Sequence, residues 1–199
     1  MKKGTIILIG VIVVILICLG SGCSSYNSMV AEQENVDKTW ANVENQYQRR
    51  ADLIPNLVST VKGYAAHEST TLEAVTNARA GLTKAYNDAN EIEDPQNNIA
   101  AYQEAQSRLK GALGIYINAV HEAYPDLKAN TNFLDLQAQL EGTENRIATE
   151  RTRYNDAVQS YNVMIRRFPA SIVAAVCGFD KKEPFKAEDG AQRAPKVEF

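Results

Sequence analysis

Three charged residues lie in register with the apolar positions of two predicted helices, where a buried core is expected. Arg50 is in register on a helix near the start of the chain, and Glu144 and Arg151 are in register on one near its end. A buried charge is costly unless a partner and further hydrogen bonds compensate it. With the two helices paired antiparallel, Arg50 falls within a turn of both. We therefore predict an internal polar layer that joins Arg50 to Glu144, with Asp52 and Arg151 nearby.

This polar layer has three possible roles. The favoured one is structural, an ion pair that fixes the register of the helices. The second is a functional polar site inside the helical body, and the third is a solvated face on which the charges meet water. Side chains that satisfy one another in a closed core favour the first role. A cavity lined by Arg50, Glu144 and Arg151 favours the second.

A second group of polar residues falls at the helix ends farthest from the predicted membrane segment described below. This distal cluster consists of His67, Glu68, His121, Glu122, Tyr124 and Asp126. Two histidines and two carboxylates can hold zinc. Neither His-Glu pair, however, has the H-E-x-x-H spacing that places two histidines on one helical face. We favour solvated helix ends, and we predict neither a metal nor a cofactor.

The cysteines and motifs of the chain point away from catalysis. Cys18 and Cys23 lie in or beside the apolar N-terminus, so Cys177 stands alone in the predicted body and no disulfide framework can form there. Cys177 has no histidine nearby in sequence, and we expect a buried small residue rather than a nucleophile. The sequence contains no G-x-S-x-G, Walker or dinucleotide-binding motif. We predict that the protein is not an enzyme and has no catalytic residue.

The charge balance speaks against nucleic acid as a partner. The chain has 21 basic and 24 acidic residues, which gives a formal net charge of −3. Nucleic-acid-binding proteins present basic surfaces instead.

The N-terminal residues predict a membrane location. Two lysines precede an uncharged stretch of nineteen residues, Gly4–Gly22, which as a helix would span roughly 28 Å, close to a bilayer core. No basic residue follows until Lys38, and this asymmetry predicts a cytoplasmic N-terminus with the body on the extracytoplasmic side. Three alternatives stay open for residues 1–25. They are a transmembrane anchor, which we favour, a lipoprotein signal ending in an acylated Cys23, and a cleaved secretion signal.

Apolar repeats predict the two long helices of the body. One row recurs every seven residues, at Phe133, Leu140, Ile147, Tyr154, Tyr161 and Phe168. This row predicts a helix over residues 131–168, and a similar 3.5-residue repeat predicts one over residues 26–64. The apolar row of each helix must pack against partner helices. Pro55 lies inside the earlier repeat, where we expect a kink near Asp52 rather than a break.

Two shorter helices lie between the long ones. A Thr70-x-x-Glu73 capping box predicts the start of the first, and a polar loop follows over residues 87–94. Asp94-Pro95 predicts the start of the second. We expect an all-α fold. It is an antiparallel up-down-up-down four-helix bundle over residues 26–179 with long first and fourth helices, an N-terminal membrane segment and a charged C-terminal tail over residues 180–199.

Several strings along the chain resemble the signature of the LemA family. They are RRADLIPNLV at 49–58, VKGY at 61–64, YPDLKAN at 124–130 and LEGTENRI at 140–147. The resemblance covers nearly the whole chain. It implies a bacterial membrane-anchored protein with a four-helix bundle and no established catalytic activity, often found beside membrane stress-response proteases and TPM-domain proteins. Many members lack a counterpart of Cys23, which leaves the lipoprotein alternative open.

These observations lead to two hypotheses for the function. The favoured one is a non-enzymatic interaction or scaffolding module at the bacterial cell envelope, held to the membrane by its N-terminal segment. Its partners would be unidentified envelope proteins, with membrane proteases and TPM-domain proteins as candidates, or a second copy of the chain. The alternative is an envelope sensor or ligand-binding bundle that uses the internal polar layer.

Overall fold

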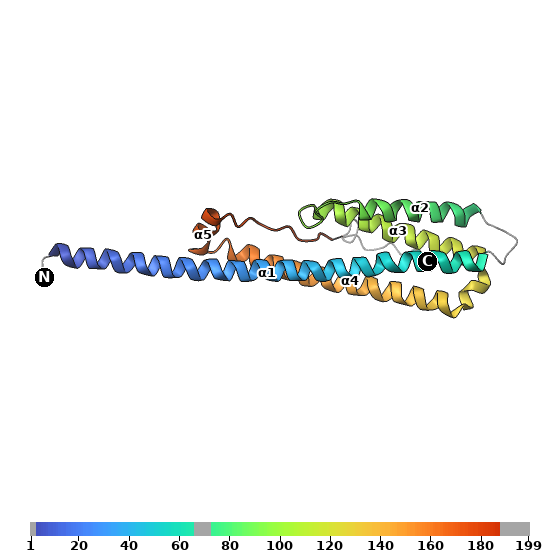
Figure 1. The fold of residues 1–199 in the computed structure, drawn as a ribbon, viewed down its shortest axis with the longest axis horizontal. Coiled ribbons are helices and arrows are strands. Elements are labelled where there is room, and N and C mark those ends of the chain that lie inside the picture. The colour runs from blue at the N-terminus through green and yellow to red at the C-terminus, as the bar shows by residue number, and fades with distance from the viewer. Residues whose placement is uncertain (1–2, 66–72, 188–199) are drawn as a thin grey trace, which may run out of the picture. The chain divides into compact units, whose positions relative to one another are not determined.

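The structure, a computed structural model, describes the backbone of residues 3–65 and 73–187. Up to residue 19, solvent exposure is described only for Gly4 and Ile12. The described part contains helices and connecting segments but no strand, which confirms the all-α prediction. In chain order (Figure 1) the helices are α1 (Lys3–Ala65), α2 (Glu73–Asn90), α3 (Ile99–Ala123), the 3₁₀ helix η1 (Pro125–Ala129), α4 (Thr131–Met164) and α5 (Ala170–Cys177).

The chain divides into two compact units, and each is described by itself. Among the described residues, the first unit joins residues 3–41 to 152–184, and the second joins residues 42–151 to 185–187. Both α1 and α4 therefore contribute residues to each unit, whereas α2 and α3 belong to the second and α5 to the first.

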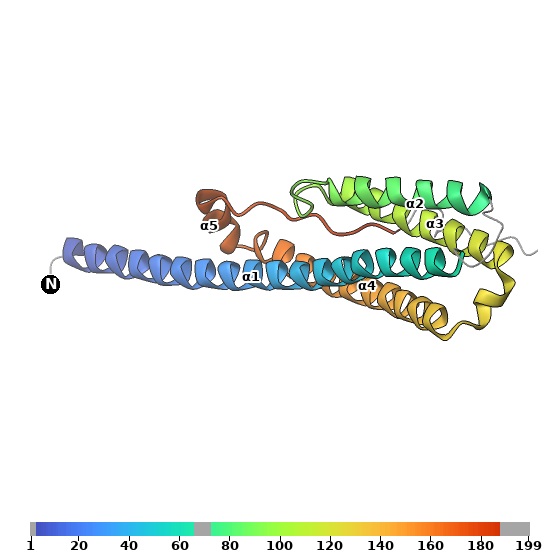
Figure 2. The same ribbon diagram turned by 45° about the vertical axis from the view of Figure 1, so that its right-hand side comes forward.

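The second unit is built around one core to which α1, α2, α3 and α4 all contribute. Leu57, Leu82, Leu109 and Phe133, one from each helix, are at most 2% exposed. Consecutive helices of this unit run in opposite directions, as the two ribbon views in Figures 1 and 2 show. Removing this apolar surface from water supplies the main driving force for packing the four segments together.

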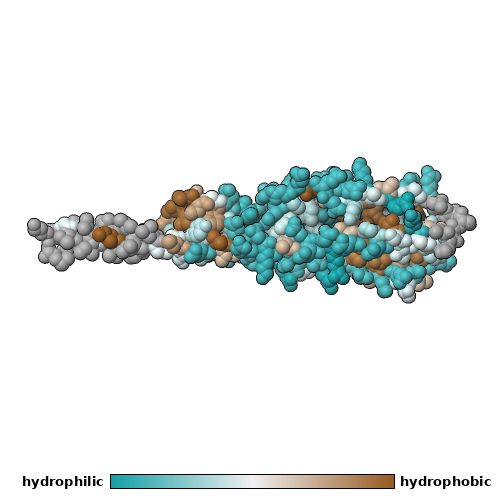
Figure 3. Space-filling view, viewed as in Figure 1, coloured by the Kyte–Doolittle hydropathy of each residue, from teal (hydrophilic) through white to brown (hydrophobic). Residues whose placement is uncertain are grey.

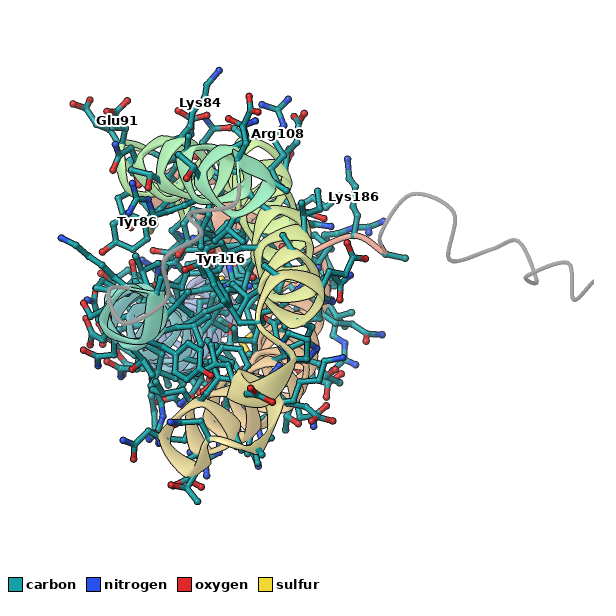
Figure 4. All side chains as sticks on the ribbon, turned by 90° about the vertical axis from the view of Figure 1, so that its right-hand side faces the viewer. Lys84, Tyr86, Glu91, Arg108, Tyr116 and Lys186 are labelled. Carbon is teal, nitrogen blue, oxygen red and sulfur yellow. The ribbon has the colours of Figure 1, made fainter. Side chains whose placement is uncertain are left out.

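Polar and apolar side chains separate cleanly in the second unit. In the view along the helices in Figure 4, Tyr116 points into the interior, whereas Lys84, Glu91 and Arg108 point outward. Tyr116 is 1% exposed and the three charged residues are exposed. This separation is what an amphipathic helical repeat predicts.

The core of the first unit is rich in aromatic residues from α1 and α4. The Trp40 and Tyr154 rings meet edge to face with centroids 5.4 Å apart, and both side chains are buried. Tyr161, one heptad further along α4, is 1% exposed. Edge-to-face pairs add about 0.5–1.5 kcal/mol to the gain from burial alone. The seven-residue row of α4 thus faces the interior in this unit as far as Tyr161.

Helix α1 continues without a break through Pro55. A proline removes one backbone donor and crowds the preceding turn. Leu53, Ile54 and Leu57 on either side of it are buried, so packing holds the helix together across the defect. The kink expected near Asp52 stays a prediction.

Two predicted boundaries of the shorter helices are wrong. Helix α2 extends into the predicted loop over residues 87–94 and ends at Asn90, because Ala89 is buried in the core and anchors the last turn. Helix α3 begins at Ile99 rather than at Asp94-Pro95. Asp94 has a positive φ of 48°, and its carbonyl accepts hydrogen bonds from the amides of Asn97 and Asn98. This closes a separate turn before the helix starts.

The end of the last long helix was also predicted too late. Helix α4 stops at Met164, and a turn leads to Pro169. Phe168 is therefore not the last member of the buried row, because the backbone has left the helical register and 83% of this side chain is exposed.

The segment after α5 is held mainly through its backbone. In the first unit, the Asn162 amide receives a hydrogen bond from Lys182 N at 3.0 Å and donates one to Lys182 O at 2.9 Å. Tyr154 Oη donates to Glu183 O at 3.2 Å. In the second unit, Gln103 forms the same two-point contact with Lys186, at 3.0 and 2.9 Å. The described part of the predicted tail is thus hydrogen-bonded to helices in each unit.

Several predictions concern residues outside the described part. The side chains of most of the uncharged N-terminal stretch and the capping residue Thr70 are among them. Across the residues that the structure does describe, no helix combines the length and the apolar character needed to cross a membrane.

Candidate functional site

Arg50 is the most deeply buried charged side chain in the described part of the chain, with 2% of its surface exposed. It projects from α1 into the core of the second unit, where its Nη1 donates to Glu144 Oε1 of α4 at 2.6 Å. Its Nη2 donates to both the side-chain and the main-chain oxygen of Gln106 on α3. The ring centroid of Tyr47 lies 5.1 Å from the guanidinium carbon. Residues from three helices therefore converge on one cation, and we call Arg50, Gln106 and Glu144 the closed layer.

Glu144 connects the closed layer to the surface. A quarter of its side chain is exposed, and its second carboxylate oxygen lies 3.8 Å from Lys110 Nζ. The carboxylate thus meets a buried cation on one side and an exposed cation on the other. Partial hydration lowers the desolvation cost that a fully buried pair would carry.

Two tyrosines extend the closed layer. The Tyr47 and Tyr102 rings meet edge to face at 5.2 Å, and both are buried. Burial, followed by the repulsion from Tyr47 and Glu44, raises the pKa of Tyr102 well above its usual range. Its hydroxyl stays protonated at neutral pH and cannot act as a base there.

The chemistry of the closed layer is that of a satisfied ion pair. The Arg50 cation faces the Glu144 anion. Both terminal guanidinium nitrogens, Nη1 and Nη2, have hydrogen-bond partners. Of the three guanidinium nitrogens of Arg50, only Nε is buried without a hydrogen-bond partner. This arrangement fixes how α1, α3 and α4 meet.

The structure brings Arg50 and Glu144 together but leaves the other two predicted members outside. Asp52 is two residues after Arg50, which turns its side chain by about 200° around the helix axis and away from the core. It is exposed and accepts a hydrogen bond from Gln48. Arg151 lies two turns beyond Glu144, roughly 10 Å further along the axis. Its guanidinium stacks 4.7 Å from the Phe185 ring centroid and donates to Lys186 O. The predicted layer is corrected accordingly.

Gln106 is the member that the sequence prediction missed. It is 7% exposed and occupies a core position of α3, four residues after Tyr102 and three before Leu109. A lone uncharged polar residue in an otherwise apolar row was the available signal. A buried amide needs a partner, and the buried arginine is the one it has.

The distal cluster does not form a metal site among the described residues. His121 packs edge to face on Phe133 at 5.6 Å, with its Nε2 3.2 Å from the Gln137 amide nitrogen. Tyr124 is buried against Tyr64, whereas Glu122 and Asp126 are exposed. His67 and Glu68 lie outside the described part. Within that part, no three His, Cys, Asp or Glu residues come together as metal ligands.

Comparison with known proteins identifies the family. A sequence model of the LemA family matches residues 39–199, which is most of the chain. The chain belongs to the LemA family. The matched region contains the closed layer, the distal cluster and the segment after α5.

Several curated proteins are similar to this LemA-family chain. Magnetosome protein MamQ 2 of Paramagnetospirillum magneticum is 30% identical over 176 residues, which cover 81% of this chain and 64% of that protein. Magnetosome protein MamQ of Magnetospirillum gryphiswaldense is 29% identical over 80% of this chain and 64% of its own length. Protein LemA of Metamycoplasma hominis is 24% identical over 74% and 63%. The chain thus spans just under two thirds of the curated relatives it matches.

Two cysteines of the LemA-family chain line one apolar groove in the first unit. Cys23 on α1 and Cys177 at the end of α5 are both exposed, and both border a groove of about 560 Å³. The expectation that Cys177 is buried is wrong. Cys177 lies on the same helical face as the buried Ala170 and Ala174, but it is the last residue of α5 and its side chain is exposed.

A smaller pocket opens in the second unit between α1, α2 and α3. It holds about 250 Å³, and its lining includes Val61, Lys62, Arg79 and Tyr116. Neither this pocket nor the groove is lined by a member of the closed layer.

Proposed function

We propose that this LemA-family chain is a non-enzymatic interaction module at a bacterial cell envelope. It is a four-helix bundle with long first and fourth helices, tethered to the membrane by its N-terminal segment and presented on the extracytoplasmic side. The observation that carries the proposal is the closed layer. Its charges satisfy one another inside the core, which leaves the outer surface as the place where function resides.

The membrane tether is supported by the sequence and the backbone together. The uncharged stretch Gly4–Gly22 is preceded by two lysines and lies in α1. An α-helix satisfies its backbone hydrogen bonds internally, which a bilayer core requires of any segment within it. The positive-inside asymmetry favours an extracytoplasmic body.

The proposed partners are other envelope proteins or a second copy of the chain. Membrane proteases and TPM-domain proteins are the candidates that the family resemblance suggests. Two of the similar proteins are named as magnetosome proteins. Those names favour a role in a cellular structure over one in soluble metabolism.

Proximity labelling in cells tests this function. A peroxidase fused after Phe199 of the full chain is compared with the same peroxidase fused to residues 1–25 alone. We expect the full chain to enrich a defined set of envelope proteins over the control fusion, because only the full chain presents the helical surface. Identical labelling by the two fusions would exclude an interaction role for the bundle.

A ligand-sensing role is the second candidate, and one observation favours it. Arg50 Nε is buried without a hydrogen-bond partner, so the layer keeps one unused donor. A small anion bound there would raise the melting temperature as its concentration rises. A thermal-shift screen of small carboxylates, with Arg50→Met as the control, distinguishes this role. The absence of any shift specific to the wild-type chain favours the interaction module.

A further inference from the structure

Helix α5 buries two alanines and leaves two of its large apolar residues exposed. Ala170 and Ala174 are buried, whereas Ile172 is 59% and Val176 82% exposed. Phe168, just before the helix, is 83% exposed. A surface helix of a globular domain normally turns its large apolar residues toward the core. The exposed apolar side chains indicate that the outer face of α5 is an interaction surface.

The exposed side of α5 forms one surface with the neighbouring part of α1. The groove of about 560 Å³ lies between α1 residues from Gly22 to Asn27 and α5 residues from Ile172 to Cys177. Figure 3 shows the apolar side chains gathered over α5 and the adjacent part of α1. Tyr26, which also borders the groove, is 43% exposed. Contiguous exposed apolar surface of this kind marks a protein or membrane interaction site.

Basic residues precede and follow α5 along the chain. Residues 165–182 contain four basic side chains, Arg166, Arg167, Lys181 and Lys182, and one acidic side chain, Asp180. The rest of the chain has 17 basic and 23 acidic residues, a net charge of −6, so the whole chain carries −3. An apolar face with a basic rim complements an anionic lipid surface, where the aliphatic side chains enter the acyl boundary and the cations meet the headgroups.

The position of the surface along the chain favours the same occupant. Gly22 in the groove is the last residue of the uncharged stretch that we propose as the membrane segment, and Cys23 directly follows it. A groove wall at the end of a membrane helix lies at the level of the headgroups. Aromatic residues such as Tyr26 and Phe168 are enriched at that level. This step rests on the tether in the proposed function.

We propose that α5, with Phe168 and the flanking basic residues, inserts into the interfacial region of an anionic phospholipid membrane. The bilayer then covers the groove and the exposed aliphatic side chains. The chain has two attachments to the membrane, the N-terminal segment and α5, and the second fixes the orientation of the first unit on the bilayer.

A fluorescent probe on Cys177 tests the proposal in the full chain. With Cys18→Ser and Cys23→Ser, Cys177 is the only thiol and takes an environment-sensitive label. The labelled chain is reconstituted into phosphatidylcholine vesicles with and without phosphatidylglycerol, and both contain a headgroup-level nitroxide lipid. We expect strong quenching with phosphatidylglycerol present. Arg166→Gln with Arg167→Gln should weaken docking by roughly tenfold or more, since each basic residue near an anionic surface favours binding about fivefold.

A variant that introduces negative charge on the exposed face of α5 is the decisive test. Ile172→Asp with Val176→Asp should abolish the quenching, because two carboxylates cannot enter the acyl boundary. Gln159→Asp with Ser160→Asp adds the same charge at exposed positions of α4 in the same unit and should leave the quenching intact. Both pairs change exposed side chains, so the fold is retained.

Flotation with the vesicles separates failure of α5 docking from failure of the tether. A chain that floats but is not quenched keeps its tether and overturns the proposal for α5. A chain that does not float at all overturns both. A probe that shifts to the blue with rising protein density, without lipid quenching, shows that a second copy covers the surface, which also overturns membrane docking.

Discussion

At the residue scale, the strongest constraint is the guanidinium of Arg50. It has an anion on α4, an amide on α3 and an aromatic face on its own helix, all within the core of the second unit. Breaking a buried pair strands the remaining partner, which costs more than the pair itself contributes.

We expect Arg50→Ala to lower the free energy of unfolding by about 3 kcal/mol, because it leaves a cavity and strands the Gln106 amide. Chemical denaturation followed by circular dichroism measures the loss. Arg108→Ala, at an exposed position of α3, is the control and should stay within about 0.5 kcal/mol of the wild type. An unchanged midpoint for Arg50→Ala would mean that the layer carries no stability.

Replacing the charged pair as a whole should behave differently. Arg50→Met combined with Glu144→Leu removes both charges while keeping apolar volume, and we expect it to recover most of the stability lost in Arg50→Met alone. A double-mutant cycle on the same denaturation measurement gives the coupling energy. A coupling near zero would mean that the two side chains do not depend on each other.

Buried tyrosines predict a loss of stability in alkali. Burial raises the pKa of Tyr116 and of Tyr154 to about 12. The native state then holds protons that the unfolded state releases near pH 10, so the full contribution is present below about pH 10 and is lost as pH rises toward 12. Each tyrosine accounts for up to about 2–3 kcal/mol of this loss. Tyr116→Phe and Tyr154→Phe should each flatten the decline in denaturation midpoints between pH 9.5 and about 11.5. Equal slopes in variant and wild type would contradict the assignment.

Residue patterns predicted the Arg50–Glu144 contact because the antiparallel register of two heptad rows brings these positions together. They placed Asp52 and Arg151 wrongly, because Asp52 lies on a different face of α1 from Arg50 and Arg151 lies two turns beyond Glu144 along α4. They missed Gln106, whose partner comes from a helix with an independent register.

At the element scale, the end of α5 depends on a left-handed backbone. Gly178 has a φ of 75°, and its amide donates to Ala174 O as the C-cap of the helix. A Cβ added there would meet no atom within 4 Å, so a substitution acts through the backbone alone.

Gly178→Ala should therefore destabilise α5 by about 1 kcal/mol, the cost of a left-handed conformation for a residue with a Cβ. Hydrogen exchange of the α5 amides should speed up by roughly fivefold. Gly111→Ala is the matched substitution, inside α3 with equally open surroundings, and should raise stability by about 0.5–1 kcal/mol. Slower exchange in Gly178→Ala would show that the cap is not needed.

The apolar rows predicted which segments form helices, but they did not predict where the helices end. The Asp94-Pro95 signal is equally compatible with a tight turn, and the local hydrogen bonds from Asn97 and Asn98 to Asp94 close that turn. Ala89 extends α2 by burial rather than by propensity. The heptad row gave no sign that α4 would stop before Phe168, because apolar type alone does not distinguish a core residue from an exposed one.

At the scale of the whole molecule, a thiol at an exposed position of α3 reports on topology. In a chain with Cys18→Ser, Cys23→Ser, Cys177→Ser and Arg108→Cys, we expect a membrane-impermeant maleimide to label position 108 on intact spheroplasts, because the body is proposed to lie outside. Labelling only after lysis would place the body in the cytoplasm.

Mass spectrometry of the N-terminus distinguishes the anchoring modes in the wild-type chain. We expect residues 1–22 to be retained, as a transmembrane anchor requires. An acylated Cys23 at the mature N-terminus would establish the lipoprotein alternative instead. The sequence could not decide between them because the same apolar stretch serves both.

The side-chain amide of Gln103 contacts only the backbone of Lys186. It donates a hydrogen bond to the Lys186 carbonyl and accepts one from the Lys186 N–H. These two hydrogen bonds do not depend on which side chain residue 186 carries. A saturation library at position 186 should therefore tolerate nearly every amino acid, with proline as the conspicuous exception because it has no N–H to offer.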